Sequence, residues 1–185
     1  MNDKNRLAAV VYDGDVAIDV LMSVFARELI DAGVDARGFL QAPREEVDCG
    51  SGKYVVVHPV RGGDPIPICH DLHPHEGACS LDRASLAGVA ARLRLDILQG
   101  SGILFVSRFG REEAHGAGFL PEFGLAMEEG LIVLTAVERR RRQAWLDFTA
   151  GRGVLLDHRL SALRDWWRKV SGRELPGVGA GPGAV

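Results

Sequence analysis

The sequence has few cysteines and no long apolar run. Cys49, Cys69 and Cys79 form an odd and sparse set, which argues against a disulfide framework and fits a reducing compartment. No apolar run approaches the roughly 18 residues expected of a membrane-spanning helix, and the polar start Met1–Arg6 is not followed by a signal-peptide core. We therefore expect a cytoplasmic protein with no membrane partner.

A large net charge is also missing. The chain has 22 Lys and Arg against 25 Asp and Glu, which gives a formal net charge of -3. This balance gives no reason to expect nucleic-acid binding, although the run Arg139–Arg142 makes one spot strongly basic. Hydrophobic residues make up 46% of the chain, enough for one sizeable core. We expect one domain over residues 1–175 and a disordered Gly/Pro/Ala tail over residues 176–185.

The chain does contain an alternation of strand-like and helix-like segments. Short apolar runs predict strands at 7–12, 34–41, 54–57, 131–137 and 154–156, and a further strand opens Gly102–Glu113. Apolar residues at helical spacing predict helices that contain residues 21–29, 86–97, 121–129, 139–150 and 160–170. This alternation is typical of a three-layer α/β fold, with helices on both faces of a mostly parallel sheet.

Polar and basic residues follow two of the predicted core strands. Ser107 and Arg108 end the apolar strand in Gly102–Glu113, and Arg139 follows the strand 131–137. Ligands of open α/β sheets bind beyond the carboxyl ends of strands, and guanidinium groups bind tetrahedral oxyanions well. The sequence therefore predicts an anion site that contains Gly14, Ser107, Arg108, Gly110, Arg111 and Arg139. In the alternative interpretation, most of Arg139–Arg142 is the solvated face of a helix, and Glu112 and Glu113 pair with the arginines.

The loop after the first strand lacks the chemistry of a nucleotide site. The phosphate-binding pattern G-x-x-x-x-G-K-[ST] needs glycines, a lysine and a hydroxyl for magnesium. Residues 12–19 read Tyr-Asp-Gly-Asp-Val-Ala-Ile-Asp, with one glycine, no lysine and three carboxylates that would repel a polyphosphate. We expect no bound nucleotide. Gly14 and the helix start could still donate backbone hydrogen bonds to a smaller anion. Asp13 or Asp15 could cap the turn and helix, or could bind a cation.

Histidine and cysteine are concentrated between Cys69 and Cys79. This segment holds three of the six histidines and two of the three cysteines. Imidazole and thiolate are common ligands of transition metals, although the spacing matches no closed structural zinc pattern. Histidine can also donate hydrogen bonds to an oxyanion. The candidates for metal or oxyanion contacts are His70, His73, His75 and Cys79, and the alternative is a solvated loop with incidental histidines.

Four segments carry a family resemblance. They read Arg-Gly-Phe-Leu-Gln at 37–41, Gly-Ala-Cys-Ser-Leu-Asp at 77–82, Phe-Val-Ser-Arg-Phe-Gly-Arg-Glu-Glu at 105–113 and Trp-Leu-Asp-Phe at 145–148. From about Leu7 to Trp167 the chain resembles an uncharacterised bacterial family, a domain of unknown function often encoded beside molybdate transport genes. The resemblance implies a link to molybdenum or tungsten metabolism, which agrees with a positively charged site for an oxyanion.

The order of segments is also remotely similar to small P-loop nucleoside triphosphatases. The shared features are a Gly-Phe after the second strand, a small hairpin, a helix that starts at Asp82, and a strand that ends in Phe-Gly-x-x-Glu at 109–113. In that family the strand carries acids that hold magnesium and activate water. Here Ser107 and Arg108 stand in those places, and only Gly110 and Glu113 fit the pattern. The resemblance implies a P-loop-like fold without a functional Walker A loop.

Our leading hypothesis is a non-enzymatic protein that binds or stores molybdate or tungstate, as single ions or as clusters. Asp82 and Glu113 would support the site, and no catalytic residue is identified, so an enzymatic activity stays an open question. One alternative is a diverged nucleotide-binding protein or triphosphatase, and another is a transition-metal-binding regulatory module. Trp145, Trp166 and Trp167 predict either a completed core or a subunit interface, and we expect a homo-oligomer.

Overall fold

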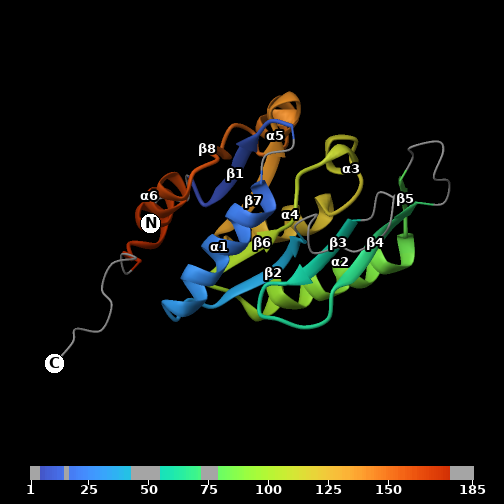
Figure 1. Cartoon of the computed structure of the whole chain (residues 1–185). Helices are drawn as coiled ribbons and strands as arrows, with labels where there is room; N and C mark the ends of the chain where they lie inside the picture. The colour runs from blue at the N-terminus through green and yellow to red at the C-terminus, as the bar shows by residue number, and fades with distance from the viewer. Residues whose placement is uncertain (1–4, 15–16, 43–54, 72–78, 176–185) are drawn as a thin grey trace.

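A single mixed sheet forms the centre of the molecule (Figure 1). The computed structural model describes residues 5–14, 17–42, 55–71 and 79–175, with the side chains of 70, 71 and 79–81 outside this description. Over these residues the sheet has eight strands in the order β5-β4-β3-β2-β6-β7-β1-β8. The strands are β1 (Leu7–Tyr12), β2 (Ala36–Gln41), β3 (Val55–Pro59), β4 (Ile66–Asp71), β5 (Cys79–Leu81), β6 (Ile103–Val106), β7 (Val133–Glu138) and β8 (Val154–Asp157).

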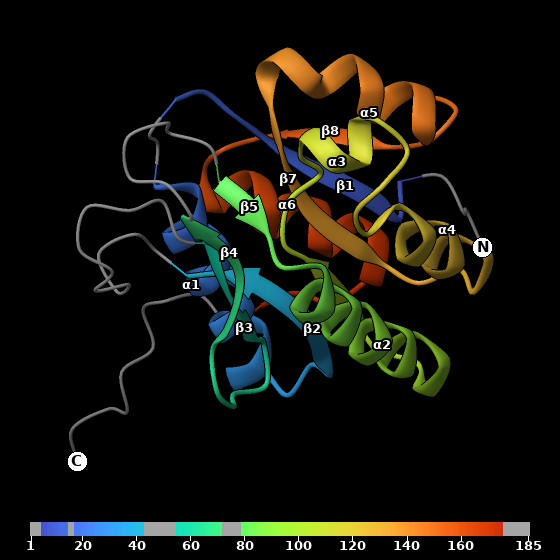
Figure 2. The same cartoon turned by 90° about the vertical axis from the view of Figure 1, so that its right-hand side faces the viewer.

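Helices connect the strands and cover both faces of the sheet. They are α1 (Ile18–Asp31), α2 (Arg83–Gln99), α3 (Arg111–Ala114), α4 (Leu120–Glu128), α5 (Arg142–Phe148) and α6 (Leu160–Ser171), with a short 3-10 turn η2 (Arg139–Arg141) before α5. Figure 2 shows α2, α4 and α5 in front of the sheet and α1 and α6 behind it. The predicted three-layer architecture is therefore confirmed.

Five neighbouring strands, β2, β6, β7, β1 and β8, run parallel, whereas β3, β4 and β5 extend the sheet as antiparallel strands. The sequence indicated the parallel strands, including β8 at the sheet edge. It did not indicate β4 and β5, because the histidine-rich segment was interpreted as a loop. β5 lies at the edge of the sheet, and an edge strand needs no continuous apolar run, since only part of its surface is buried.

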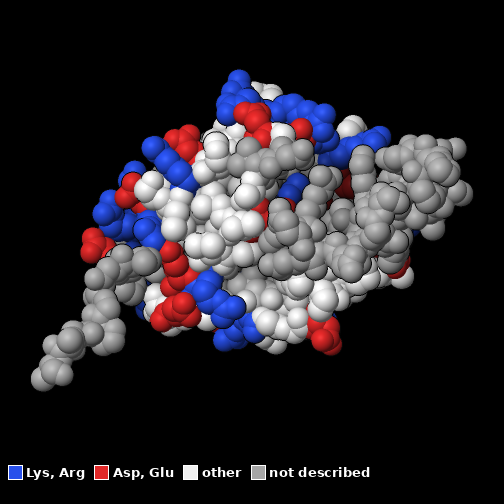
Figure 3. Space-filling model, in the orientation of Figure 1, with Lys and Arg blue, Asp and Glu red and all other residues white. Residues whose placement is uncertain are grey.

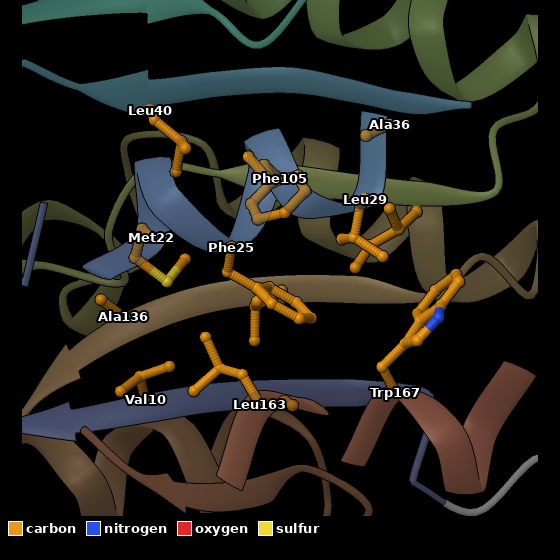
Figure 4. Packing of buried hydrophobic residues seen from close by; sticks show 14 of the residues in the cluster. Val10, Met22, Phe25, Leu29, Ala36, Leu40, Phe105, Ala136, Leu163 and Trp167 are labelled. Carbon is orange, nitrogen blue, oxygen red and sulfur yellow. The ribbon is translucent and has the colours of Figure 1, made fainter. Parts of the chain in front are cut away.

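The two faces of the sheet bury two separate apolar clusters. In β6, Ile103 and Phe105 point to the α1/α6 face, and Leu104 and Val106 point to the α2/α4/α5 face. This alternation follows from the two-residue period of a strand, and a strand buried on both faces is apolar throughout. Figure 4 shows Phe25 of α1 against Phe105, whose ring centroids lie 6.4 Å apart in an edge-to-face arrangement.

All three tryptophans complete the core. Trp145 lies in the cluster under α5, and Trp166 and Trp167 lie in the cluster under α6, with exposed fractions of 0%, 4% and 2%. The indole Nε1 of Trp166 donates a 2.8 Å hydrogen bond to the carbonyl of Asn5, which anchors the start of the chain. Among the described residues, no helix combines the length and apolarity that a membrane crossing requires.

Candidate functional site

The carboxyl ends of β6, β7, β1 and β8 lie side by side, because these strands are parallel neighbours. Ser107 and Arg108 follow β6, the run Arg139–Arg142 follows β7, and Gly14 lies just beyond β1. Asp157, His158 and Arg159, at the end of β8, also lie at this edge, and they were not among the predicted site residues. Strand order thus brings together segments that are far apart in the sequence.

Arg108 forms a two-pronged ion pair with Asp19. Its Nε donates to one carboxylate oxygen at 3.3 Å, and a terminal nitrogen donates to the other. The remaining terminal nitrogen donates to the Tyr12 hydroxyl at 3.2 Å, and the guanidinium carbon lies 5.1 Å from the Tyr12 ring centroid. Because Asp19 lies in the first turn of α1, this pair joins the end of β6 to the start of α1. Arg108 is therefore a paired cation.

Asp13 pairs with Arg139 across the gap between β1 and η2. The Nε of Arg139 lies 2.5 Å from the Asp13 carboxylate, and both side chains are more than half exposed, at 56% and 60%. Asp13 does not cap α1, whose N-cap residue is Ala17 without a side-chain cap bond. The next arginines, Arg140 and Arg141, both pair with Glu138. The exposed Asp13–Arg139 pair contributes about 0–1 kcal/mol, so an incoming anion can compete with it.

Glu113 organises the segment after β6. Its two carboxylate oxygens accept backbone N–H bonds from Gly110 and Phe119, each at 2.9 Å, and the residue is only 8% exposed. Burial raises the pKa of Glu113 above its usual value, although the backbone bonds oppose this shift. Among the described residues, neither Glu112 nor Glu113 forms an ion pair with an arginine. The alternative in which these acids pair with the arginines is not realised in the described residues, because backbone N–H groups of the same connection bind Glu113.

A cleft rich in arginine opens beside the carboxyl ends of β1 and β8. Its volume is about 520 Å³, and we call it the arginine cleft. Figure 3 shows Lys and Arg side chains along the upper edge of the molecule, over the region where Figure 1 places α5 and β8. The residues that line it are Val11, Arg139, Arg142, Leu155, Leu156, Asp157, His158 and Arg159.

Three arginines face one aspartate in the lining of this cleft. Arg159 pairs with Asp157 at 3.1 Å, and Arg139 pairs with Asp13 outside the lining. Arg142 has no ion-pair partner within the part of the chain that the structure describes. The cleft therefore carries an excess of positive charge and one guanidinium group available to a ligand.

Of the six residues predicted for the anion site, the arginine cleft contains only Arg139. Ser107 is buried with 8% exposure, the Gly110 N–H is held by Glu113, and Arg111 is exposed at the start of α3. Asp157 to Arg159 were missed, although they show the same signal as Arg108: polar and basic residues directly after a strand.

Most of the histidine-rich segment lies outside the described residues. The side chains of His70 and Cys79, and the whole of His73 and His75, lie outside the described residues. Within the described part, no group of three or more His, Cys, Asp or Glu could hold a metal ion. Cys69 is disulfide-bonded, so a sparse cysteine count did not exclude a disulfide.

Asp82 acts as the N-cap of α2. Its carboxylate accepts N–H bonds from Ala84 at 2.9 Å and Ser85 at 3.3 Å, and the Ser85 hydroxyl donates to it at 2.7 Å. This agrees with the capping signal in the sequence and gives Asp82 a structural role at the start of the helix.

Comparison with known proteins supports the family and the fold. A family described as "Protein of unknown function (DUF2478)" matches residues 7–166. The molybdenum import ATP-binding protein ModC 2 of Bradyrhizobium diazoefficiens is 34% identical over 173 residues, which are 92% of this chain and 19% of that relative. The chain thus spans about a fifth of the length of the curated relative it matches.

A solved structure shares the fold. The solution structure of a human cancer-related nucleoside triphosphatase superposes with a TM-score of 0.67 and 18% sequence identity, covering 91% of this chain and 98% of that chain. The predicted P-loop-NTPase-like α/β fold is therefore confirmed. The first loop of this chain nevertheless lacks the lysine and hydroxyl of the phosphate-binding pattern, so the chain is a diverged version of that fold.

Proposed function

We propose that this chain, which belongs to the DUF2478 family, binds a tetrahedral oxyanion of the molybdate or tungstate type in the arginine cleft. The observation that carries this proposal is the convergence of Arg139, Arg142 and Arg159 on one cleft at the carboxyl edge of the sheet. Arg142 is the best candidate for binding the anion, because its guanidinium group has no carboxylate partner among the described residues.

The chemistry of the lining suits such a ligand. A planar guanidinium group donates two parallel N–H bonds to an oxyanion, and charged bonds of this kind are stronger than neutral ones. Arg139 and Arg159 would exchange exposed carboxylate partners for the anion, at little cost in free energy. The cleft of about 520 Å³ is larger than one tetrahedral oxyanion and leaves room for hydration or a small cluster.

The choice among oxyanions comes from one relative. A protein named for molybdenum import is 34% identical to this chain, and the proposal carries that ligand class over to it. The positive charge and the volume of the cleft also suit sulfate and phosphate, so these anions are the competitors to include in a binding experiment.

Magnesium-dependent hydrolysis of a nucleotide is the weaker candidate. The Arg108 guanidinium group lies between the end of β6 and the start of α1, where it pairs with Asp19. A cation at this position repels a divalent metal and also uses the nearby carboxylate. Glu113, the acid that fits the hydrolase pattern, has both oxygens bound to backbone N–H groups.

Isothermal titration with sodium molybdate and tungstate at low salt tests the proposal. We expect the wild type to bind the anion. Arg142→Gln should bind it at least about tenfold more weakly, because the variant loses the two parallel N–H bonds from this guanidinium group to the anion. Arg173→Gln is the matched control, because Arg173 is exposed beyond α6 and away from the cleft. It should bind as the wild type does.

Two results would overturn the proposal. One is the absence of heat with either anion, together with no anomalous peak in crystals soaked in tungstate. The other is equal affinity of Arg142→Gln and the wild type. Release of phosphate from ATP with magnesium would instead support the nucleotide alternative. Elemental analysis of untagged protein would separate bound molybdenum or tungsten from zinc or copper, the metals expected of a regulatory module at Cys69–Cys79.

A further inference from the structure

A second cleft lies between α2 and the turn that joins β3 to β4. Its volume is about 790 Å³, within the range of small-molecule sites, and it shares no lining residue with the arginine cleft. We call it the α2 groove. Figure 2 shows α2 beside β3 and β4 on the face of the sheet toward the viewer. The groove is thus independent of the oxyanion proposal.

Gly88 keeps the helix side of the α2 groove open. A Cβ atom at Gly88 would meet nothing within 4 Å, so the space beside this turn of α2 is empty. A glycine inside a helix destabilises it relative to alanine, and no positive φ angle requires glycine here. Helix stability therefore does not explain the glycine at position 88, whereas an open groove does.

Part of the lining of the α2 groove is apolar and accessible. Ile66 of β4 is half-buried and Leu95 of α2 is 58% exposed, whereas Phe39 and Val89 in the same lining are buried, at 3% and 0% exposure. A flat apolar group of a ligand would be well placed on this surface.

Two charged groups of α2 also line the groove. Arg92 has no ion-pair partner among the described residues. Asp96 accepts a 3.2 Å bond from the Gly38 N–H, and its nearest cation, Arg37, is 3.9 Å away. Arg37 is itself held by Asp35 at 3.0 Å and by the Gln99 side chain at 2.6 Å. Burial raises the pKa of Asp96, which agrees with incomplete compensation of its charge.

We infer that the α2 groove binds a small organic anion that carries an aromatic ring system and an N–H donor. The ring would lie on Ile66 and Leu95, the anionic group would pair with Arg92, and the N–H would donate to the Asp96 carboxylate. This combination of an apolar surface with a few convergent polar groups is typical of small-molecule sites.

Anilinonaphthalene sulfonate is a suitable probe, since it has aromatic rings, one sulfonate and one N–H. Fluorescence titration should show one saturable site per chain, and molybdate should not displace the dye. Gly88→Leu should weaken binding at least about tenfold by filling the groove, and Arg92→Gln should weaken it several-fold.

Gly124→Leu is the matched control. Gly124 is also a helical glycine with nothing within 4 Å of an added Cβ, but it lies in α4 and does not line the groove. Its dye affinity should equal that of the wild type. Near-UV circular dichroism checks that each variant keeps its packing, and Arg92→Gln decides the question if Gly88→Leu fails to fold. The inference is wrong if the wild type shows no saturable binding, or if both groove variants bind as tightly as the control.

Discussion

At the scale of single residues, the partners of each arginine decide its role. Arg108 and Asp19 are 28% and 16% exposed, whereas Arg139 and Asp13 are 56% and 60% exposed. Partial burial strengthens the first pair and leaves the second screened by solvent. Arginines that looked equivalent in the sequence therefore divide into a structural pair and groups available to a ligand.

Replacing Arg108 with Gln should lower the free energy of unfolding by about 2 kcal/mol, because the half-buried Asp19 carboxylate and the Tyr12 ring lose their contacts with the guanidinium group. Arg139→Gln removes an exposed pair and should cost less than about 1 kcal/mol. Urea unfolding of both variants measures the difference. Equal losses would show that Arg108 has no special structural role.

Asp35 makes stability depend on pH. The hydrogen bond from Arg37 lowers the pKa of Asp35 below its usual value of 3.8. A lowered pKa means that the folded state favours the carboxylate, so this stabilisation is present at neutral pH and is lost as the pH falls through the folded-state pKa. The stability margin of the wild type over Asp35→Asn should therefore be full at pH 7 and shrink in acid. Denaturant unfolding of both proteins at pH 7 and in acid measures this margin. A margin that does not change with pH would contradict the lowered pKa of Asp35.

At the scale of elements, the connection from β6 to α4 is built around one buried carboxylate. Glu113 accepts bonds from both ends of this connection, at Gly110 and Phe119. Gly118 has a φ of 61°, and a Cβ there would lie 2.1 Å from a Glu113 oxygen. The glycine is therefore needed for two reasons, the backbone conformation and the close approach of the carboxylate.

Gly118→Ala should destabilise the protein by more than about 2 kcal/mol, through backbone strain and displacement of Glu113. Gly116→Ala is the matched control in the same connection. Gly116 has a φ of 85° but nothing within 4 Å of an added Cβ, so only the backbone strain of about 1 kcal/mol applies. Thermal unfolding of the two variants compares these costs, and similar losses would remove Glu113 from the explanation.

At the scale of the whole molecule, the net charge of -3 conceals an uneven distribution. The carboxyl edge of the sheet collects arginines after β7 and β8, and the arginine cleft is open to solvent. Attraction between an exposed cleft and an anion is screened by salt, and the Debye length falls from about 10 Å at 0.1 M to about 3 Å at 1 M.

The affinity for molybdate should therefore fall about tenfold or more between low salt and 0.5 M sodium chloride, a range over which screening becomes strong. Titration calorimetry at a series of salt concentrations measures this dependence, with sodium sulfate omitted because sulfate competes. Affinity that does not change with salt would place the bound anion in a buried site elsewhere in the chain.

The sequence by itself determined most of the helices and strands and their order, but not β4 or β5. The strand at Leu7–Tyr12, the N-cap Asp82 and the mostly parallel sheet all follow from local signals, namely apolar period, capping side chains and glycine positions. These signals act between residues that are close along the chain. The family resemblance also came from the sequence, on motifs that span most of its length.

Only the tertiary structure decided which charges remain available for a ligand. Arg108 lies 89 residues from Asp19, and Arg139 lies 126 residues from Asp13, so no spacing rule could pair them. The addition of β4 and β5 to the sheet and the place of Arg159 beside Arg142 depend in the same way on contacts between distant segments. Coulomb and hydrogen-bond energies depend on distance in space, and folding alone sets that distance.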